Sequence, residues 1–410
     1  MRKSIEYNNL IKKIVRKIGS GGLLLLTAPV VMFAVLVRPF VLVRFGILRS
    51  ERIGHFAADT EAYLCGLDQE PSAKFRVDII GCLEPVCNLY LKQMWKRTFP
   101  ITSGAYLWRL LDRSCQFWTR GDIHHAKMDG LSKYYKYLLI TPPHLYFTDE
   151  EKQLGRELLS QLDIPVGSKW VCVHNRDSAY LKKTLGHVQQ WSYHDYRDFS
   201  IHSMMSAAEE LAGRGYYVIR LGAIQSETHS SSNRKIIDYA SSPHRSDFGD
   251  IYLSSGCSFY IGSDSGIACL PLIFRKPVCF INFTLTAVDL IPKQQCYRLP
   301  FITKHLFHKK KSRFLSLREM FEAGLHNAGQ SHRFVEAGVE VVSNTPEEIC
   351  DLAIEVSERL KGQWQPQTED ETLQQRFWEL VRRYALKSNW GDIKPLIGSA
   401  FLRQHQYLLE

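Results

Sequence analysis

The stretch Gly262-Ser263-Asp264-Ser265-Gly266 is the part of this chain that says most about its fold. The apolar run Cys257–Ile261 before it predicts a buried strand, and Ile267–Phe274 after it predicts a helix. The next apolar run, Val278–Ile281, follows Lys276-Pro277 and predicts another strand. A strand, a turn of small residues, a helix and a second strand predict a parallel α/β sheet.

The same turn is a candidate ligand site, because parallel sheets bind ligands beyond the carboxyl ends of their strands. A helix N-terminus at that place favours an anion such as phosphate. Gly262 and Gly266 allow close backbone approach, and the hydroxyls of Ser263 and Ser265 can donate to phosphate oxygens. Asp264 can orient the turn or accept from a sugar hydroxyl. A second interpretation stays open, in which Ser or Asp caps the helix and no ligand binds.

Length and composition predict a globular protein of two to three domains, with 410 residues of which 45% are hydrophobic and 23% are charged. The net charge of +10 suits nucleic acid, an anionic membrane or phosphorylated substrates. The chain has no arginine-rich tract and no nucleic-acid-binding module, so we expect no nucleic-acid partner.

The ten cysteines form no C-x-x-C pair, and several lie in apolar runs, which favours a reducing, cytosolic compartment. His124-His125 has no third ligand at metal spacing. No D-x-D motif occurs, so a metal-held diphosphate is not indicated and we expect no metal site.

The amino-terminal residues 1–38 combine basic side chains with an uncharged run, Gly21–Val37. No small-residue cleavage site follows, which argues against a secretory signal. The run is at the short limit for spanning a bilayer, and Pro29 interrupts it. A buried core helix is the alternative to membrane contact. We expect a monotopic segment in the cytosolic leaflet of the inner membrane, where basic residues meet anionic head groups: Arg2, Lys3, Lys12, Lys13, Arg16 and Lys17.

The rest of the chain predicts two α/β domains and a helical end. Residues 39–145 begin with a strand, Phe40–Leu48, and form the first domain. Residues 146–345 form the second domain, and residues 346–410 are predicted to be helical.

In the second domain, Thr148–Glu151 predicts a capped helix start, Lys169–His174 a buried strand and Phe301–Leu306 another strand. Asn344–Glu348 predicts a further helix start, with proline and acids in its first turn.

Four segments follow predicted strands and can share one ligand site, because ligands of open α/β sheets bind at carboxyl ends. They are Arg52–His55, His174–Asp177, Arg220–Gly222 and Ser263–Gly266. In the third of these, Arg220 and Gly222 are candidates for donor binding.

Arg176 is the best candidate for a phosphate ligand, because a guanidinium binds two phosphate oxygens at once and keeps its charge. The alternative is an ion pair with Asp177 or Asp198. His174 can donate to a phosphate or hydroxyl, or simply pack at a strand end. Lys304 is a weaker basic candidate.

The first domain offers candidates for a general base. His55 or Asp59 can take the proton of an acceptor hydroxyl. Arg52 and Gly54 form a basic, glycine-containing loop that can contact the acceptor or a phosphate.

Several of these motifs resemble those of known glycosyltransferases. His174-Asn175-Arg176 resembles the H-x-R segment of GT-B enzymes related to fucosyltransferases, in which the Arg binds the donor diphosphate. Gly262–Gly266 followed by Lys276-Pro277 resembles the donor-phosphate turn of that superfamily and of heptosyltransferases. The heptosyltransferase-like histidine is absent, since Leu270 and Pro271 occupy its region.

The order of the motifs is similar to that in a family of bacterial glycosyltransferases from surface-polysaccharide loci. The similar segments are Arg52–His55, His174–Asp177, Tyr217–Gly222, Ile237–Tyr239 and Gly262–Gly266. The resemblance implies a GT-B fold, with two Rossmann-like domains facing a cleft and the last helix crossing back to the first domain. It implies a nucleotide-sugar donor on the second domain and a glycan or lipid-linked acceptor on the first.

We therefore expect a metal-independent glycosyltransferase of surface-polysaccharide synthesis that needs no cofactor besides its donor. Two alternatives stay open. One is a nucleotide-sugar 2-epimerase, which would convert the donor without any acceptor. The other is a non-catalytic membrane-bound scaffold, which would bind no nucleotide sugar.

Overall fold

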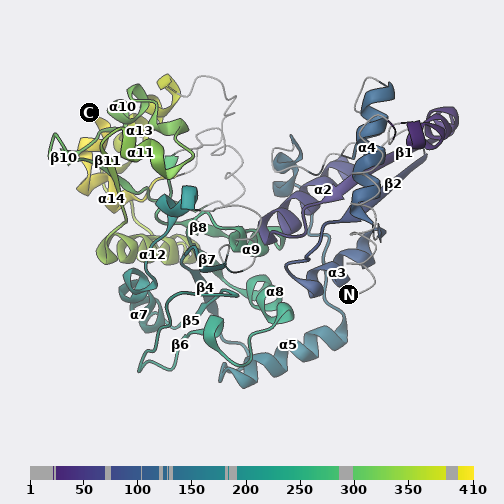
Figure 1. Cartoon of the computed structure of the whole chain (residues 1–410). Helices are drawn as coiled ribbons and strands as arrows, with labels where there is room; N and C mark the ends of the chain where they lie inside the picture. Colours follow the sequence, from purple (N-terminus) through teal and green to yellow (C-terminus); the bar gives the residue numbers. More distant parts are fainter. Residues whose placement is uncertain are drawn as a thin grey trace. The chain divides into compact units, whose positions relative to one another are not determined.

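The computed structural model divides the chain into two compact units, Met1–Tyr146 and Phe147–Glu410, and each is described here by itself (Figure 1). The described residues, with the side chains of 133–135 excepted, are 22, 25–69, 75–102, 104–119, 123–126, 128, 133–180, 183, 192–285, 299–384 and 396–410.

The first unit is built on a parallel sheet of three strands in the order β1-β2-β3. The predicted first strand is confirmed as β1, Val41–Leu48. Phe45 of β1 also forms an isolated parallel bridge with His125. The other elements are β2 (Phe75–Cys82), β3 (Ile101–Thr102), the π-helical turn η1 (His55–Asp59), α2 (Thr60–Gln69), α3 (Leu89–Thr98), α4 (Ala105–Thr119) and η2 (Lys133–Leu139).

The amino-terminal run forms a helix over residues 25–37, which packs on the first unit along one face only. Val31 belongs to a core cluster with Phe45, Leu111 and Cys115. On the same face, the Thr27 hydroxyl donates to Ser114 Oγ at 2.7 Å. None of the described helices is both long and apolar enough to cross a membrane. The predicted basic cluster between residues 2 and 17 lies outside the described residues.

The second unit contains a parallel sheet of five strands in the order β6-β5-β4-β7-β8. In chain order this is 3-2-1-4-5, so the direction of winding reverses between β4 and β7. The parallel α/β sheet predicted around residues 257–281 is therefore confirmed. The strands are β4 (Trp170–His174), β5 (Tyr217–Arg220), β6 (Ile236–Ile237), β7 (Phe259–Gly262) and β8 (Val278–Phe280).

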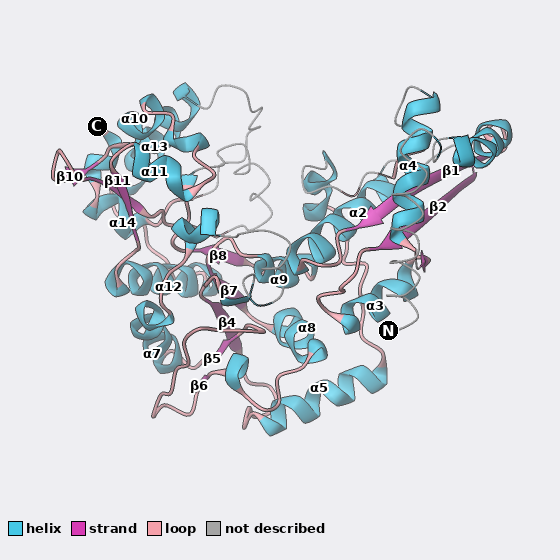
Figure 2. Ribbon diagram, in the orientation of Figure 1, coloured by secondary structure: helices cyan, strands magenta, loops and turns pink. Residues whose placement is uncertain are grey.

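Helices cover this sheet on two sides. Helix α7 (Met205–Gly213) contacts β5, whereas α8 (Asp247–Gly256) contacts β4, and the strands lie between these helices in Figure 2. Helix α12 (Pro346–Lys361) packs on α7. The predicted start of α5 (Asp149–Gln161) is confirmed, because the Thr148 side chain caps it in a capping box with Glu151.

The carboxyl-terminal part forms a second, antiparallel sheet of three strands in the order β10-β9-β11. The predicted strand Phe301–Leu306 is displaced: β9 begins at His305, and Phe301 forms an isolated bridge with Ile397. The elements are β9 (His305–His308), β10 (Arg313–Phe314), α10 (Leu317–Glu322), α11 (Ser331–Glu336), β11 (Val339–Val342), α13 (Asp370–Tyr384), α14 (Ser399–Gln404) and η9 (Gln406–Leu409). The crossing of the last helix to the first unit stays a prediction.

Candidate functional site

The carboxyl ends of three neighbouring strands carry the predicted donor segments. In the sheet register His174 at the end of β4 pairs with Gly262 of β7, and Val173 pairs with Arg220 of β5. A Cβ at position 262 would lie 2.5 Å from the His174 carbonyl oxygen, so only glycine allows this approach. The segments after His174, Arg220 and Gly262 therefore lie together, and the point where the winding reverses lies between the first and the last of them.

Three basic side chains gather at this point; we call Arg176, Arg197 and Lys304 the cationic centre. Arg176 is 7% exposed, and its Nη1 donates to the Asp198 carboxylate and to the His194 carbonyl at 3.0 Å. The ion pair with Asp198, which was the alternative to phosphate binding, is thus present in this structure. The same guanidinium also lies near Arg197.

The other two members of the cationic centre contact the same loops. Arg197 lies at the end of η3 (Ser192–Arg197), and its Nε donates to Asp264 Oδ1 at 3.2 Å. The Lys304 ammonium donates to the Asp198 carbonyl at 2.7 Å and to Ser343 Oγ at 3.1 Å. The carboxylates of Asp198 and Asp264 therefore balance cations that are mostly buried.

The pKa values show how closely these charges are balanced. Burial lowers the pKa of Lys304 to about 8, against the opposite effect of Asp198 and Asp264. Burial also raises the pKa of Asp198 to about 6, although Arg176 opposes this shift. Burial and the neighbouring Arg197 lower the pKa of Arg176. An anionic ligand at this place would replace weakly held carboxylates as partner of the cations.

The turn between Ser263 and Gly266 does not cap a helix through its side chains. Ser265 occupies the N-cap position of η6 (Gly266–Ala268), but its side chain makes no capping hydrogen bond. Asp264 pairs with Arg197. The Ser263 side chain is fully buried, and its hydroxyl has no hydrogen-bond partner among the described residues. The capping interpretation is therefore wrong here.

The helix after this turn has nearly the predicted bounds. It consists of η6 followed by α9 (Cys269–Ile273), which has five residues. Arg275 takes a left-handed conformation, with φ 61°, and Lys276 N donates to the Pro271 carbonyl at 2.9 Å. This pattern ends the helix. The cations and the buried hydroxyl, rather than a helix dipole, therefore make this site suitable for an anion.

His174 is not arranged as the hydrogen-bond donor to a ligand that we expected. Its Nδ1 lies 2.9 Å from the Leu221 carbonyl oxygen, which can only accept, so Nδ1 donates. Burial lowers the pKa of His174 to about 4, so the ring is neutral at pH 7 and its Nε2 keeps a lone pair. His174 is thus suited to accept from a ligand hydroxyl and not to donate to phosphate.

Arg220 is held by acceptors of the protein. Its Nη1 donates to the Glu227 carbonyl at 2.8 Å and to Asp238 Oδ2 at 3.1 Å. Its Nη2 donates to Asn175 Oδ1 at 3.1 Å. Gly222 has a φ of 154°, a backbone conformation that favours glycine, so Gly222 shapes this loop. Arg220 and Gly222 were predicted to bind the donor, but in the structure their contacts hold this loop together.

In the first unit the two alternative candidates for a general base form one pair. His55 Nδ1 lies 2.8 Å from Asp59 Oδ2 across η1. The side chain of His55 is 25% exposed and that of Asp59 is 3% exposed. Arg52 and Gly54 do not form an open loop, because Gly54 is helical and Phe56 N donates to the Arg52 carbonyl at 2.9 Å.

The sequence prediction missed Arg197 and gave Lys304 little weight. Arg197 lies in the segment between β4 and α7, which carries Ser192–Arg197 as a 3₁₀ helix. Its position in a long connection after a buried strand was the signal, since such connections reach over the carboxyl edge of the sheet. Lys304 had no such signal, because it follows β8 by a segment without a clear pattern.

No family model matches this chain, and no curated protein matches it. Among solved structures it is similar to E. coli ADP-heptose LPS heptosyltransferase II, with 9% identity over 58% of this chain and 84% of that chain and a TM-score of 0.36. It is also similar to a glycosyl transferase family 9 protein from Veillonella parvula, with 10% identity over 58% and 79% and a TM-score of 0.36. A third similar structure is E. coli heptosyltransferase WaaC with ADP-2-deoxy-2-fluoro heptose, with 9% identity over 58% and 89% and a TM-score of 0.31. Similarity at this level does not establish a shared fold or activity, so the function has to be argued from the residues of this chain.

Proposed function

We propose that this protein is a glycosyltransferase that moves a sugar from a nucleotide-activated donor to a glycan or lipid-linked acceptor. One observation carries the proposal. Where the winding of the parallel sheet reverses, the cationic centre lies beside a turn whose Ser263 hydroxyl is buried and unpartnered among the described residues. This is the place at which such sheets bind nucleotides, and its chemistry suits a diphosphate. The motif order in the sequence narrows this to a nucleotide sugar.

In the reaction, the bond between the sugar and the diphosphate breaks and negative charge grows on the leaving nucleoside diphosphate. Arg176, Arg197 and Lys304 would stabilise that charge, because fixed cations in a partly buried site act where charge develops. The diphosphate would take Arg176 from Asp198, whose raised pKa lets it accept a proton. No step of this scheme requires a metal ion.

The acceptor hydroxyl must lose a proton as it attacks the sugar, and we assign this role to His55. The Asp59 carboxylate accepts from Nδ1 of His55, which leaves the Nε2 lone pair of the neutral ring to take the proton. The buried Asp59 fixes the orientation of the ring, and the partly exposed His55 can be reached by an acceptor.

A transfer assay with purified protein tests the assignment. Nucleotide sugars are first screened by thermal shift in the presence of EDTA, and the one that raises Tm is then used as donor with a bacterial lipid extract. We expect His55→Ala to lower the transfer rate about 100-fold or more while donor binding is unchanged. The matched control is His202→Ala, a histidine of the second unit outside both sites.

The alternatives give different results in the same assay. A 2-epimerase would change the donor sugar without the lipid extract, which NMR of the sugar detects. A scaffold would bind no nucleotide sugar and release no nucleotide. Either result, or full activity of His55→Ala, would contradict the proposal.

The amino-terminal helix is suited to hold the enzyme at an anionic membrane. Its packed face carries Val31, while the other face is apolar and exposed, with Leu25 67%, Phe33 63% and Leu36 76% exposed. Apolar side chains next to a basic sequence favour an interfacial position at the cytosolic leaflet.

Vesicle flotation tests this membrane contact. We expect the protein to float with phosphatidylglycerol vesicles and less with phosphatidylcholine vesicles. The double change Phe33→Asp/Leu36→Asp should lower binding about tenfold or more, because each buried apolar side chain contributes about 1.5–3 kcal/mol. Val335→Asp, at an exposed apolar residue of the second unit, is the matched control. Equal binding by both variants would refute the role of this face.

A further inference from the structure

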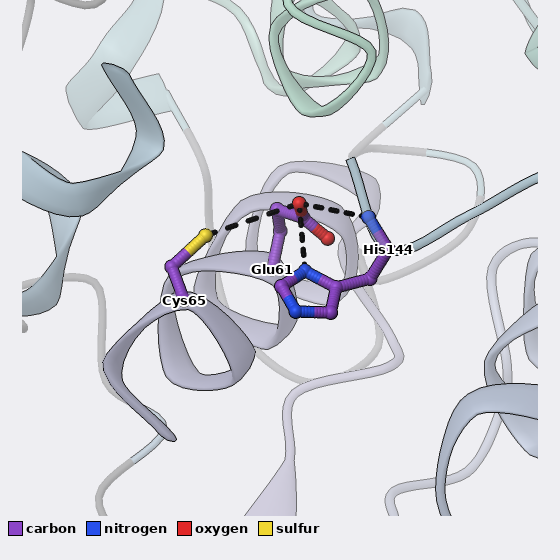
Figure 3. A group of neighbouring side chains, drawn as sticks. All are labelled: Glu61, Cys65 and His144. Atoms are coloured by element: carbon purple, nitrogen blue, oxygen red, sulfur yellow. Dashed lines mark hydrogen bonds and ion pairs between the residues drawn. The ribbon is translucent and has the colours of Figure 1, made fainter. Parts of the chain in front are cut away.

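Three side chains of types that bind metal ions lie together in the first unit, apart from the residues assigned to catalysis. Glu61 and Cys65 project from successive turns of α2, and His144 comes from the segment that leaves this unit, as Figure 3 shows. One ligand atom from each residue lies within 4.8 Å of the other two. We infer that Glu61, Cys65 and His144 form a binding site for a zinc-type divalent cation.

The distances between the donor atoms fit such an ion. His144 Nδ1 lies 3.1 Å from Glu61 Oε1, and Cys65 Sγ lies 3.9 Å from the same oxygen. Ligand atoms about 2.0–2.3 Å from a tetrahedral zinc ion are roughly 3.3–3.8 Å apart. Small movements of the side chains would therefore bring all three donors to an ion placed between them, with water at the fourth position.

The chemistry of the set selects zinc over magnesium or calcium. A thiolate and an imidazole are ligands of zinc and similar transition metals, whereas the hard alkaline-earth ions prefer oxygen. The carboxylate of Glu61 and the thiolate of Cys65 would together neutralise a dication. This matters because both side chains are fully buried, with 0% exposure.

A second observation points to the same ligand. The other ring nitrogen of His144, Nε2, lies 3.0 Å from Asp68 Oδ2. Metal-bound histidines commonly donate their outer ring N–H to a carboxylate, which fixes the ring and makes the inner nitrogen a better ligand. The Thr141 hydroxyl donates to the Tyr137 carbonyl at 2.7 Å and lies 2.8 Å from Cys65 Sγ, so the sulfur has a polar neighbour.

The ion would tie two parts of the first unit together. Helix α2 begins directly after the π-helical turn that holds His55 and Asp59. His144 lies two residues before the end of the unit at Tyr146. The proposed ion therefore fixes the outgoing segment to the helix that continues from the proposed base, and it takes no part in donor binding.

The same contacts also describe a metal-free arrangement, in which a protonated His144 bridges Glu61 and Asp68. Burial alone would lower the pKa of His144, but hydrogen bonds to Cys65 and Glu61 raise it to about 10. A second group, His305, Glu348 and His405, has similar donor spacing in the other unit but contains no sulfur. The experiment has to separate both from the proposed site.

Titration of the reduced, metal-free full-length protein with cobalt(II) chloride makes this separation. A thiolate bound to cobalt gives an intense near-ultraviolet charge-transfer band, which carboxylate and imidazole ligands do not. We expect one such band that saturates at one cobalt per chain and is removed by zinc chloride. Cys65→Ala should abolish the band, while Cys115→Ala, at another buried cysteine of the same unit, should keep it.

Two further variants test the site without removing the sulfur. Asp68→Asn should weaken cobalt binding about 10- to 100-fold while the band stays, because it removes only the outer partner of His144. His305→Gln should leave the band and the affinity unchanged. Circular dichroism of the metal-free variants checks that each is folded.

Absence of a charge-transfer band in the wild-type protein overturns the proposal, as does a band that persists in folded Cys65→Ala. If Cys65→Ala does not fold, the affinity of Asp68→Asn decides, and an unchanged value counts against the site. None of these results bears on glycosyl transfer, so the two proposals fail independently.

Discussion

Arg176 and Arg220 follow or end neighbouring strands of one sheet, yet their surroundings differ. Both are buried, with 7% and 3% exposure. The Arg220 guanidinium donates to four acceptors of the protein. Three of them are side chains, which come from its own loop and from the residues that follow β6 and β4. The Arg176 guanidinium donates to one carboxylate and one carbonyl, and two more cations lie beside it.

The comparison teaches that burial and strand position do not by themselves mark a ligand-binding arginine. What distinguishes Arg176 is that two further cations lie near it, beside a polar atom that has no partner among the described residues, the Ser263 hydroxyl. Both terminal nitrogens of Arg220 already have acceptors in the folded chain, and only its Nε lacks a partner among the described residues. We therefore expect substitution of Arg220 to affect stability and substitution of Arg176 to affect donor binding.

The largest effect should come from Arg220→Ala. It removes the cation paired with the buried Asp238 and leaves Asn175 Oδ1 without its donor, so the free energy of unfolding should fall by about 3–5 kcal/mol. Urea unfolding of the intact protein measures this. The control is Arg214→Ala, which removes a half-exposed arginine paired with Glu210 and Glu358 and should cost about 1 kcal/mol or less. Equal losses of unfolding free energy in both variants would contradict the structural role of Arg220.

Arg176→Ala should act mainly on the ligand. Loss of charged hydrogen bonds to a diphosphate should weaken donor binding about 100-fold, or about 3 kcal/mol. The free protein should lose less stability than with Arg220→Ala, because Asp198, whose pKa is already raised to about 6, can take up a proton. Calorimetry of donor binding and urea unfolding are both needed. Donor affinity within threefold of wild type would contradict the assignment.

Donor binding should depend on pH through Lys304. Its pKa in the free protein is lowered to about 8, and a bound diphosphate would raise it again. Affinity should therefore be constant just below pH 8 and fall by up to about tenfold per pH unit above it, because binding then requires proton uptake. Lys304→Met should bind more weakly and lose this pH dependence between pH 7 and 9.5. A pH dependence of donor affinity that remains in Lys304→Met would show that another group titrates.

The stability of the free protein should depend on pH through Lys304 with the opposite sign to donor affinity. The unfolded chain binds more protons than the folded one between pH 8 and the ordinary pKa of lysine, near 10.5. The contribution of Lys304 to stability therefore rises with pH across this window, while donor affinity falls. A stability difference between wild type and Lys304→Met that does not change over this window would contradict the lowered pKa.

The smallest effect should come from Ser263→Ala. The buried hydroxyl lacks a partner among the described residues, so its removal should raise the stability of the free protein by about 1 kcal/mol. Donor affinity should fall about fivefold, because the hydroxyl no longer donates to the ligand. Ser254→Ala is the matched control, since that buried hydroxyl donates to the Asp250 carbonyl and its loss should be destabilising. The same sign of stability change in both variants would refute this reading of Ser263.

Local sequence patterns predicted most of the regular elements. Capping residues marked the starts of α5 and α12, and apolar runs marked β1, β4 and β7. The antiparallel sheet was missed, because β9 pairs with β10 and β11 and the latter partner lies far along the chain. The helix after Gly266 was predicted with nearly the right bounds, because Lys276-Pro277 marks its end. The left-handed conformation of Arg275 was not predictable, because it is unusual for a residue other than glycine.

The candidate site was predictable only as a set of strand ends. The sequence placed His174, Arg176 and Ser263 at such ends, but it could not give the strand order that makes β4 and β7 neighbours. Nor could it show that His55 and Asp59 form one pair, because that contact depends on the π-helical turn. The tautomer of His174 follows from a carbonyl on another strand end, which is a tertiary contact.

Hydrogen–deuterium exchange of the intact protein tests most directly where the donor binds. The nucleotide sugar that raises Tm is added, and exchange is compared with that of the free protein. We predict slower exchange in residues 192–198 and 263–268, and unchanged exchange in residues 223–229 beside Arg220. Protection of residues 223–229 without protection of residues 263–268 would contradict the central claim.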